Sequence, residues 1–218
     1  MSKMLYSKIK RLLDILFSIV ILIITSPLLI IIFLLIWLTD GGDTLLRDPL
    51  RIGQNEKEFR MYKFRTMIPD AHNEILHNPE YSELKKEWEK NGNKLKINKD
   101  SRITTVGKIL RKTDLDELPQ LINVLKGEMS LVGPRPTYKD EVERHLKKNP
   151  KDLKYFKQIS TVRPGITGLW QVSGRNEIAF SERLRMDTEY SEKYNLWLDL
   201  KILLKTPYIV ITRKGAYE

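Results

Sequence analysis

The segment 110–136 reads LRKTDLDELPQLINVLKGEMSLVGPRP, and it places the acid pair Asp116-Glu117 between two arginines. Arg111 precedes the acids, and Arg135 follows them in the sequence Gly-Pro-Arg-Pro. Adjacent carboxylates flanked by arginines indicate an anionic substrate that is handled through a metal ion and a carboxylate nucleophile.

The residues after the acid pair predict a short helix. Pro119 suits a first helical turn, and the apolar run that follows predicts a helix ending at Gly127. The acids are therefore expected at or just before a helix N-terminus, where free N–H groups and the helix dipole favour an ionised Asp116 and a nearby phosphate. The alternative is a capping box made by Asp114 and Glu117, and spacing alone favours it because caps far outnumber nucleophiles.

Further blocks stand before and after this segment: KRLLD at 10–14, KFRTM at 63–67, DSRIT at 100–104, RPGITG at 163–168 and GRN at 174–176. Together with LDELPQLINVLKGEMSLVGPRP, these blocks closely resemble the bacterial sugar transferases, the single-domain monotopic polyprenol-phosphate phosphoglycosyltransferases. One motif such as Gly-Pro-Arg-Pro would be weak, but the ordered set extends along nearly the whole chain. The resemblance therefore outweighs the capping-box interpretation.

The resemblance implies a reaction. A phosphosugar moves from a UDP-sugar to polyprenol (undecaprenyl) phosphate, which yields polyprenol diphosphosugar and UMP as the first membrane step of glycoconjugate assembly. Asp116 is then expected to be the nucleophile that forms an aspartyl-phosphosugar. Glu117, with Asp116 beside it, is expected to bind the cofactor Mg²⁺, because this ion is commonly held by one or two carboxylates and the substrate. Neither the sugar nor the glycoconjugate pathway can be read from the residues.

The negative charge of the reactants requires compensating cations. Each like-charge contact at 4 Å costs about 4 kcal/mol at an effective dielectric constant near 20. The candidate phosphate-binding residues are Lys63, Arg65, Arg111, Arg135, Arg163 and Arg175. For Lys63 and Arg65 the alternative is a solvated basic strand edge. For the glycine-rich segment 163–176, the functional expectation is a backbone close to a ligand, and the alternative is an ordinary tight connection.

The chain departs from the family pattern in two places. Asp114 stands where relatives often carry Ser or Asn, and it adds an acid beside the nucleophile. We expect it to cap the following helix and to face away from the site, because it would otherwise increase the negative charge there. The segment 44–49 also departs from the pattern, and no role is assigned to it.

Bulk composition narrows the class of protein. A chain of 218 residues has room for one domain and an anchor. The absence of cysteine excludes disulfides, thiolate catalysis and thiolate zinc sites, and the 3 scattered histidines argue against a histidine metal site. The net charge of +10 favours anionic partners: nucleic acid, acidic lipid or a phosphorylated substrate.

The uncharged run at 15–38 identifies a membrane segment. As a straight helix it would reach about 36 Å, enough to cross a hydrocarbon core of about 30 Å. The run is too long for a cleaved signal peptide and has no cleavage site after it. Trp37 at its end suits an interfacial anchor.

A re-entrant hairpin is favoured over a spanning helix for this segment. Thr25-Ser26-Pro27 lies at its centre, and proline kinks a helix by removing a backbone hydrogen bond. The basic residues before the run favour a cytoplasmic N-terminus, so a single crossing would export the remaining domain away from cytoplasmic nucleotide sugars. A kink at Ser26 and Pro27 keeps both ends inside, as the resemblance implies, and a spanning helix remains the alternative.

Periodicity predicts the other elements. Gly41-Gly42-Asp43 suggests the exit turn, and alternation at 59–64 predicts a short strand or an extended segment. The segment 70–90 suggests one helix, and 140–157 an exposed helix that is broken near Pro150. Apolar residues recur with helical spacing at 197–211, which is equally consistent with a core helix and with an amphipathic helix on the bilayer.

These observations predict an α/β, mostly helical monotopic membrane protein. Residues 1–40 would form the re-entrant helix-break-helix, and 41–218 a catalytic domain with interfacial helices on the cytoplasmic face of the bacterial membrane. The expected partners are a UDP-sugar, polyprenol phosphate and membrane lipids; nucleic acid is not expected, and a homodimer stays open. The rival function is a non-catalytic, membrane-tethered basic protein that binds anionic lipid or nucleic acid, which would leave the acid pair unexplained.

Overall fold

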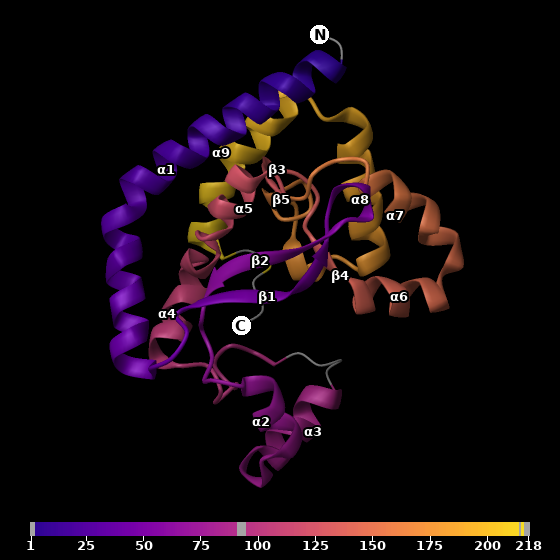
Figure 1. The fold of residues 1–218 in the computed structure, drawn as a ribbon. Helices are drawn as coiled ribbons and strands as arrows, with labels where there is room; N and C mark the ends of the chain where they lie inside the picture. Colours follow the sequence, from indigo (N-terminus) through magenta and orange to yellow (C-terminus); the bar gives the residue numbers. More distant parts are fainter. Residues whose placement is uncertain (1–2, 91–94, 214, 216–218) are drawn as a thin grey trace.

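The computed structural model describes residues 3–90, 95–213 and 215. The helices are α1 Lys3–Asp40, α2 Ala71–His77, α3 Ser82–Lys90, α4 Thr105–Thr113, α5 Gln120–Lys126, α6 Lys139–Lys148, α7 Leu153–Ile159, α8 Phe180–Lys193 and α9 Leu196–Thr212. The strands are β1 Leu45–Ile52, β2 Glu58–Phe64, β3 Ser130–Val132, β4 Thr137–Tyr138 and β5 Gly165–Thr167. Figure 1 shows α1 along one side, α6 and α7 on the other, and the strands between them. The expected mostly helical α/β class is confirmed.

The strands form two small sheets, and the segment 130–138 contributes to both. In one sheet β1 and β2 form an antiparallel hairpin, and β4 lies antiparallel to β1 with Tyr138 opposite Arg51. In the other sheet β3 and β5 run parallel. The Gly-Pro-Arg-Pro turn at 133–136 therefore passes from one sheet to the other, and its two ends are held by different strands.

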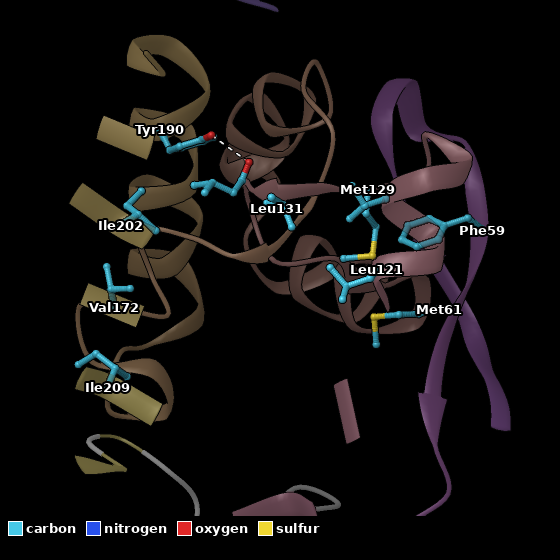
Figure 2. Close-up of a cluster of buried hydrophobic side chains, with 11 residues drawn as sticks. Phe59, Met61, Leu121, Met129, Leu131, Val172, Tyr190, Ile202 and Ile209 are labelled. Carbon is cyan, nitrogen blue, oxygen red and sulfur yellow. Dashed lines mark hydrogen bonds between the residues drawn. The ribbon is translucent and has the colours of Figure 1, made fainter. Parts of the chain in front are cut away.

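Strand β2 lies where alternation predicts a strand, and its alternating apolar residues form one side of the main hydrophobic core. Phe59 and Met61 are buried there. Figure 2 shows them on one side of the cluster, with Ile202 of α9 on the other. The hydroxyl of Tyr190 on α8 donates to the carbonyl oxygen of Val132 at 3.0 Å. The core thus joins the β1–β2 hairpin to the C-terminal helices directly behind the Gly-Pro-Arg-Pro turn.

Helix α1 contains Pro27 and remains helical through it. The expected break into two helices is therefore wrong, although Figure 1 shows α1 bending part-way along its length. Pro27 has no N–H to offer the carbonyl of Ile23, and the hydroxyl of Ser26 donates to that oxygen instead, at 2.8 Å. Within the described chain, α1 is the one helix whose length and composition would allow it to cross a membrane.

Both ends of α1 contact the same domain. Near its start, the buried carboxylate of Asp14 accepts a hydrogen bond of 2.7 Å from the Ser130 hydroxyl of β3. Near its end, Ile36 is buried in a second cluster with Phe64 and Leu110. The middle of the helix is solvent-facing and apolar; for example, Ile24 is 73% exposed. The helix therefore lies along the domain and exposes an apolar surface at its centre.

Helix α9 has apolar side chains on two faces. Ile202 and Ile209 are buried in the core. The stripe that the sequence singles out lies outside: Trp197, Leu204 and Ile211 are 71%, 71% and 80% exposed. The core-helix interpretation of that stripe is therefore wrong, because the core takes the opposite face of the same helix.

The charged helices follow the prediction only in part. The segment 140–157 is broken at the expected place, since α6 ends before Pro150. The single helix expected at 70–90 is wrong, because α2 ends at His77 and α3 begins at Ser82. Asn78 is extended before Pro79, as proline disfavours a helical conformation in the residue that precedes it, and its side chain caps the 3₁₀ turn between the helices.

Candidate active site

The acid pair lies in a 3₁₀ turn, Leu115–Glu117, between α4 and α5. This is the predicted place just before a helix N-terminus. Helix α5 ends at Gly127 as predicted: its φ of 84° is left-handed, a conformation that glycine adopts without steric cost, and its N–H donates to the carbonyl of Val124 at 2.9 Å.

Glu117 forms an ion pair with Arg135 of the Gly-Pro-Arg-Pro turn. The Nη2–Oε1 distance is 2.9 Å and the Nη1–Oε2 distance is 3.5 Å, so both arms of the guanidinium face the carboxylate. Burial acts to raise the pKa of Glu117, but the charge and hydrogen bonds of Arg135, together with Lys63 and Arg175, lower it below the ordinary glutamate value. Glu117 is therefore held as an anion.

The pKa of Asp116 is shifted in the opposite direction to that of Glu117. Burial, followed by the negative charge of Glu117, raises the pKa of Asp116 to about 6, while the charges of Lys63 and Arg111 act against that rise. Two adjacent carboxyl groups with pKa values moved apart are typical of sites that assign them different roles. Asp116 is then an ionised but more basic carboxylate at neutral pH.

Arg111 reaches the acids from α4. Its Nε donates to the hydroxyl of Thr66 at 2.9 Å, and its charge acts on Asp116. Gly107 on the same helix allows this approach, because a Cβ there would overlap the backbone of Thr66. The close crossing of α4 over the end of the KFRTM block therefore brings Lys63 and Arg111 to the acids.

Asp114 ends α4, where its N–H donates to the carbonyl of Leu110, but its side chain does not cap the following helix, so both sequence interpretations of it are wrong. Its φ is 55°, and its side chain makes no capping hydrogen bond. Its Oδ2 instead accepts a hydrogen bond of 2.8 Å from Nη2 of Arg175, and its charge helps to raise the pKa of Asp116. Asp114 thus faces the site, and Arg175 offsets its charge there.

The remaining candidate arginines have partners elsewhere. Arg65 is buried and donates to the carbonyl of Gly41 in the predicted exit turn, where Gly41 has a left-handed φ of 60°. Arg163 donates from Nε to the carbonyl of Gly127 at 3.0 Å, at the end of α5 opposite to the acids. The structure therefore brings Lys63, Arg111, Arg135 and Arg175 to the acid pair, but not Arg65 or Arg163.

The glycines at 163–168 make a tight backbone connection with the Gly-Pro-Arg-Pro turn. A Cβ on Gly133 would lie 2.5 Å from the carbonyl oxygen of Arg163 and 2.8 Å from the nitrogen of Gly165. The N–H of Gly165 donates to the carbonyl of Pro134 at 2.8 Å, and that of Gly133 donates to Thr167 at 2.9 Å. These glycines thus hold the turn that carries Arg135.

The chain is similar in sequence to known bacterial proteins. The family model described as bacterial sugar transferase matches residues 5–213. The chain belongs to the bacterial sugar transferase family. It is 45% identical over 212 residues to the undecaprenyl-phosphate galactose phosphotransferase of Salmonella typhimurium, covering 96% of this chain but 42% of that protein.

Shorter members of the family align over most of their length. The exopolysaccharide production protein ExoY of Rhizobium meliloti is 40% identical over 213 residues, which cover 95% of this chain and 88% of that protein. The uncharacterized sugar transferase EpsL of Bacillus subtilis is 34% identical over 210 residues, which cover 96% and 91%. The chain therefore spans less than half of the Salmonella protein and nearly all of EpsL.

Sequence analysis missed two residues of this bacterial sugar transferase that border the site. Tyr138 follows the Gly-Pro-Arg-Pro turn, and its phenol acts electrostatically on Arg111 and Arg135. The guanidinium carbon of Arg51 lies 3.2 Å from the centroid of its ring. Arg183 on α8 donates to the carbonyl of Arg135 at 2.8 Å. Position directly after the turn could have singled out Tyr138; no local pattern distinguishes Arg183 from the other charged residues of α8.

The acid pair fits a magnesium ion that is shared with a substrate. No cluster of three or more metal-ligating His, Cys, Asp or Glu side chains occurs among the described residues. Mg²⁺ does not require one, because one or two carboxylates and the oxygens of a bound phosphate commonly hold it. Asp116 and Glu117 adjoin each other in one turn, and the lowered pKa of Glu117 keeps it in the ligating form.

Proposed function

We propose that this chain transfers a sugar phosphate from a UDP-sugar to polyprenol phosphate, releasing UMP. The observation that carries the proposal is the acid pair with divergent pKa values, surrounded by Lys63, Arg111 and Arg135. Family membership supports it, as does the name of the Salmonella typhimurium relative, which specifies galactose phosphotransfer and undecaprenyl phosphate.

In the first half of the proposed reaction, a carboxylate oxygen of Asp116 attacks the sugar-bearing phosphorus of the UDP-sugar. A bond forms between that oxygen and phosphorus, the bond to the bridging oxygen breaks, and UMP leaves with the electron pair. In the second half, an oxygen of polyprenol phosphate attacks the same phosphorus and releases Asp116. The raised pKa of Asp116 supports this role, because a more basic carboxylate that is still ionised is a better nucleophile.

The surrounding charges make this attack feasible. A carboxylate that approaches a diphosphate meets at least two negative charges, each costing about 4 kcal/mol at 4 Å and an effective dielectric constant near 20. Lys63 and Arg111 act on Asp116, and Arg135 holds Glu117. Glu117 and Asp116 would hold Mg²⁺, which when bound would neutralise charge on the diphosphate.

We infer further that the protein is monotopic, with α1 entering and leaving the membrane on the cytoplasmic face. The contacts of Asp14 and of Ile36 support this, because they tie both ends of α1 to one domain. The bend in α1 also supports this topology. There the Ser26 hydroxyl donates to the carbonyl oxygen of Ile23, which receives no N–H from Pro27. The exposed apolar stripe of α9 would then lie in the membrane interface beside α1.

A UMP-release assay tests the proposed function. The full chain, purified in detergent, is incubated with Mg²⁺, a short polyprenol phosphate and each of several UDP-sugars, beginning with UDP-galactose. Release of UMP with one or more donors, and formation of a polyprenol diphosphosugar, are expected. Absence of UMP with every donor, together with binding to anionic vesicles, would instead favour the non-catalytic lipid-binding alternative.

A further inference from the structure

Arg183 of α8 contacts the backbone that carries Arg135. Its Nη2 lies 2.8 Å from the carbonyl oxygen of Arg135 and 2.9 Å from the hydroxyl of Thr137. The Thr137 hydroxyl is itself 3.3 Å from the same carbonyl oxygen, to which it donates. The guanidinium and the hydroxyl therefore form a bracket around the carbonyl of one peptide group.

Two aromatic rings and a carboxyl group surround the Arg183 side chain. The side chain is buried, with its guanidinium carbon 4.7 Å from the ring centroid of Trp170 and 5.5 Å from that of Phe180. Its Nε faces Oδ2 of the buried Asp187 at 3.5 Å, and burial raises the pKa of that carboxyl to about 7 against the charge of Arg183. A planar guanidinium can stack on rings while donating in its plane, which a lysine ammonium cannot do.

The Arg135 peptide group, whose carbonyl Arg183 and Thr137 contact, sets the position of the backbone from which the Arg135 side chain extends. Pro134 and Pro136 restrict the backbone on either side, since proline has a fixed φ. The carbonyl of Pro134 accepts a hydrogen bond of 2.8 Å from the N–H of Gly165, and Thr137 pairs with Ile52 of β1. Between these two points, Arg183 and the Thr137 hydroxyl donate to the carbonyl of Arg135.

We propose that Arg183 is a positioning residue, which acts through the Arg135 carbonyl and Thr137 to hold the Arg135 guanidinium against Glu117. This inference rests on the proposed function for its kinetic consequence, but its structural part does not. Since a misplacement of about 1 Å can cost about 10²-fold in rate, loosening the turn should slow transfer without removing any group that touches the substrate.

The first test is kinetic. Arg183→Lys keeps the charge but loses the planar fork, and kcat for UMP release should fall between tenfold and about 10²-fold. Arg185→Lys is the matched control, because Arg185 is an exposed arginine on the same helix that pairs with Glu182 at 3.2 Å; its kcat should equal that of the wild type. Thr137→Val should also lower kcat, and Thr137→Ser, which keeps the hydroxyl, should restore it.

A double-mutant cycle separates positioning from general structural damage. Once Arg135→Ala has removed the guanidinium, there is nothing left to position, so adding Arg183→Lys should change kcat by no more than about twofold. If Arg183→Lys costs the same factor with and without the Arg135 side chain, Arg183 does not act through it and the proposal is overturned.

Hydrogen–deuterium exchange gives a readout that needs no activity. Exchange of the peptide covering 130–138 should be faster in Arg183→Lys than in the wild type and unchanged in Arg185→Lys. Unchanged exchange of that peptide in Arg183→Lys would overturn the bracket. If the wild type releases no UMP, the proposed function fails, while this measurement still decides whether Arg183 holds the turn.

Discussion

Arg135 and Glu117 are 18 residues apart in the chain and form an ion pair of 2.9 Å in the folded protein. This pair keeps Glu117 ionised, and the Glu117 charge in turn helps burial to raise the pKa of the adjacent Asp116 to about 6. One contact between the 3₁₀ turn and the Gly-Pro-Arg-Pro turn thus gives two neighbouring carboxyl groups different protonation behaviour.

Asp116→Asn keeps the shape of the side chain and removes the nucleophile. UMP release should fall by at least about 10³-fold, because no covalent intermediate can form. The measurement is trapping of a radiolabelled phosphosugar on the protein, which should succeed with the wild type and fail with Asp116→Asn. Appreciable turnover by Asp116→Asn would exclude the aspartyl intermediate.

The same variant provides a check on folding. The pKa of Asp116 is raised in the folded state, so its contribution to stability is fully present below the ordinary carboxyl pKa and is lost as pH rises through about 6. Asparagine does not ionise, so Asp116→Asn does not lose stability in this way as pH rises. The Tm of Asp116→Asn should therefore equal or exceed that of the wild type at pH 8; a lower Tm would indicate that its inactivity reflects misfolding.

The pH dependence of the rate follows from the same shift. Only ionised Asp116 attacks, so kcat/KM should rise with pH, with a midpoint near the Asp116 pKa of about 6, and level off above it. Lys63 acts to lower that pKa, so Lys63→Met should move the midpoint to higher pH. Asp114 acts to raise it, so Asp114→Asn should move the midpoint to lower pH. A midpoint near 4 in the wild type, or shifts of the opposite sign, would contradict this assignment.

Glu117→Gln tests the metal. A neutral amide is a poorer ligand for a hard cation, so the Mg²⁺ concentration for half-maximal activity should increase by at least about tenfold. The wild type should lose activity on treatment with EDTA and regain it with Mg²⁺. Full activity of the wild type after exhaustive EDTA treatment would show that Glu117 has no metal role.

Membrane topology can be measured with single cysteines, because the chain has none of its own. Lys3 is the first residue of α1, and Lys99 lies after the helix, so Lys3→Cys and Lys99→Cys report on its two ends. In intact cells neither should react with a membrane-impermeant thiol reagent, and both should react after lysis. Pro27→Leu restores the missing N–H and should favour a straight, spanning helix that exposes Lys3→Cys outside. Labelling of Lys3→Cys in intact cells with the natural Pro27 would show that α1 crosses the membrane.

The sequence by itself determined the features that depend on neighbours in the chain. Alternation predicted the strand that carries Phe59 and Met61, and the position of Gly127 predicted the end of α5, because strand pleating and helix termination act over a few residues. The ordered motifs identified the family and the acid pair. Helical periodicity over 70–90 failed to predict the division at Asn78 and Pro79, which a different local rule explains, because a residue before proline favours an extended conformation.

Only the tertiary structure determined which partners the charged side chains contact. It paired Asp114 with Arg175, turned Arg65 and Arg163 to backbone carbonyls elsewhere, and placed Arg183 behind Arg135. It also left the outer stripe of α9 exposed, because the core uses the opposite face. The physical reason is that an arginine can pair with any acid or carbonyl in reach, and the packing of distant segments, rather than sequence spacing, determines which one that is.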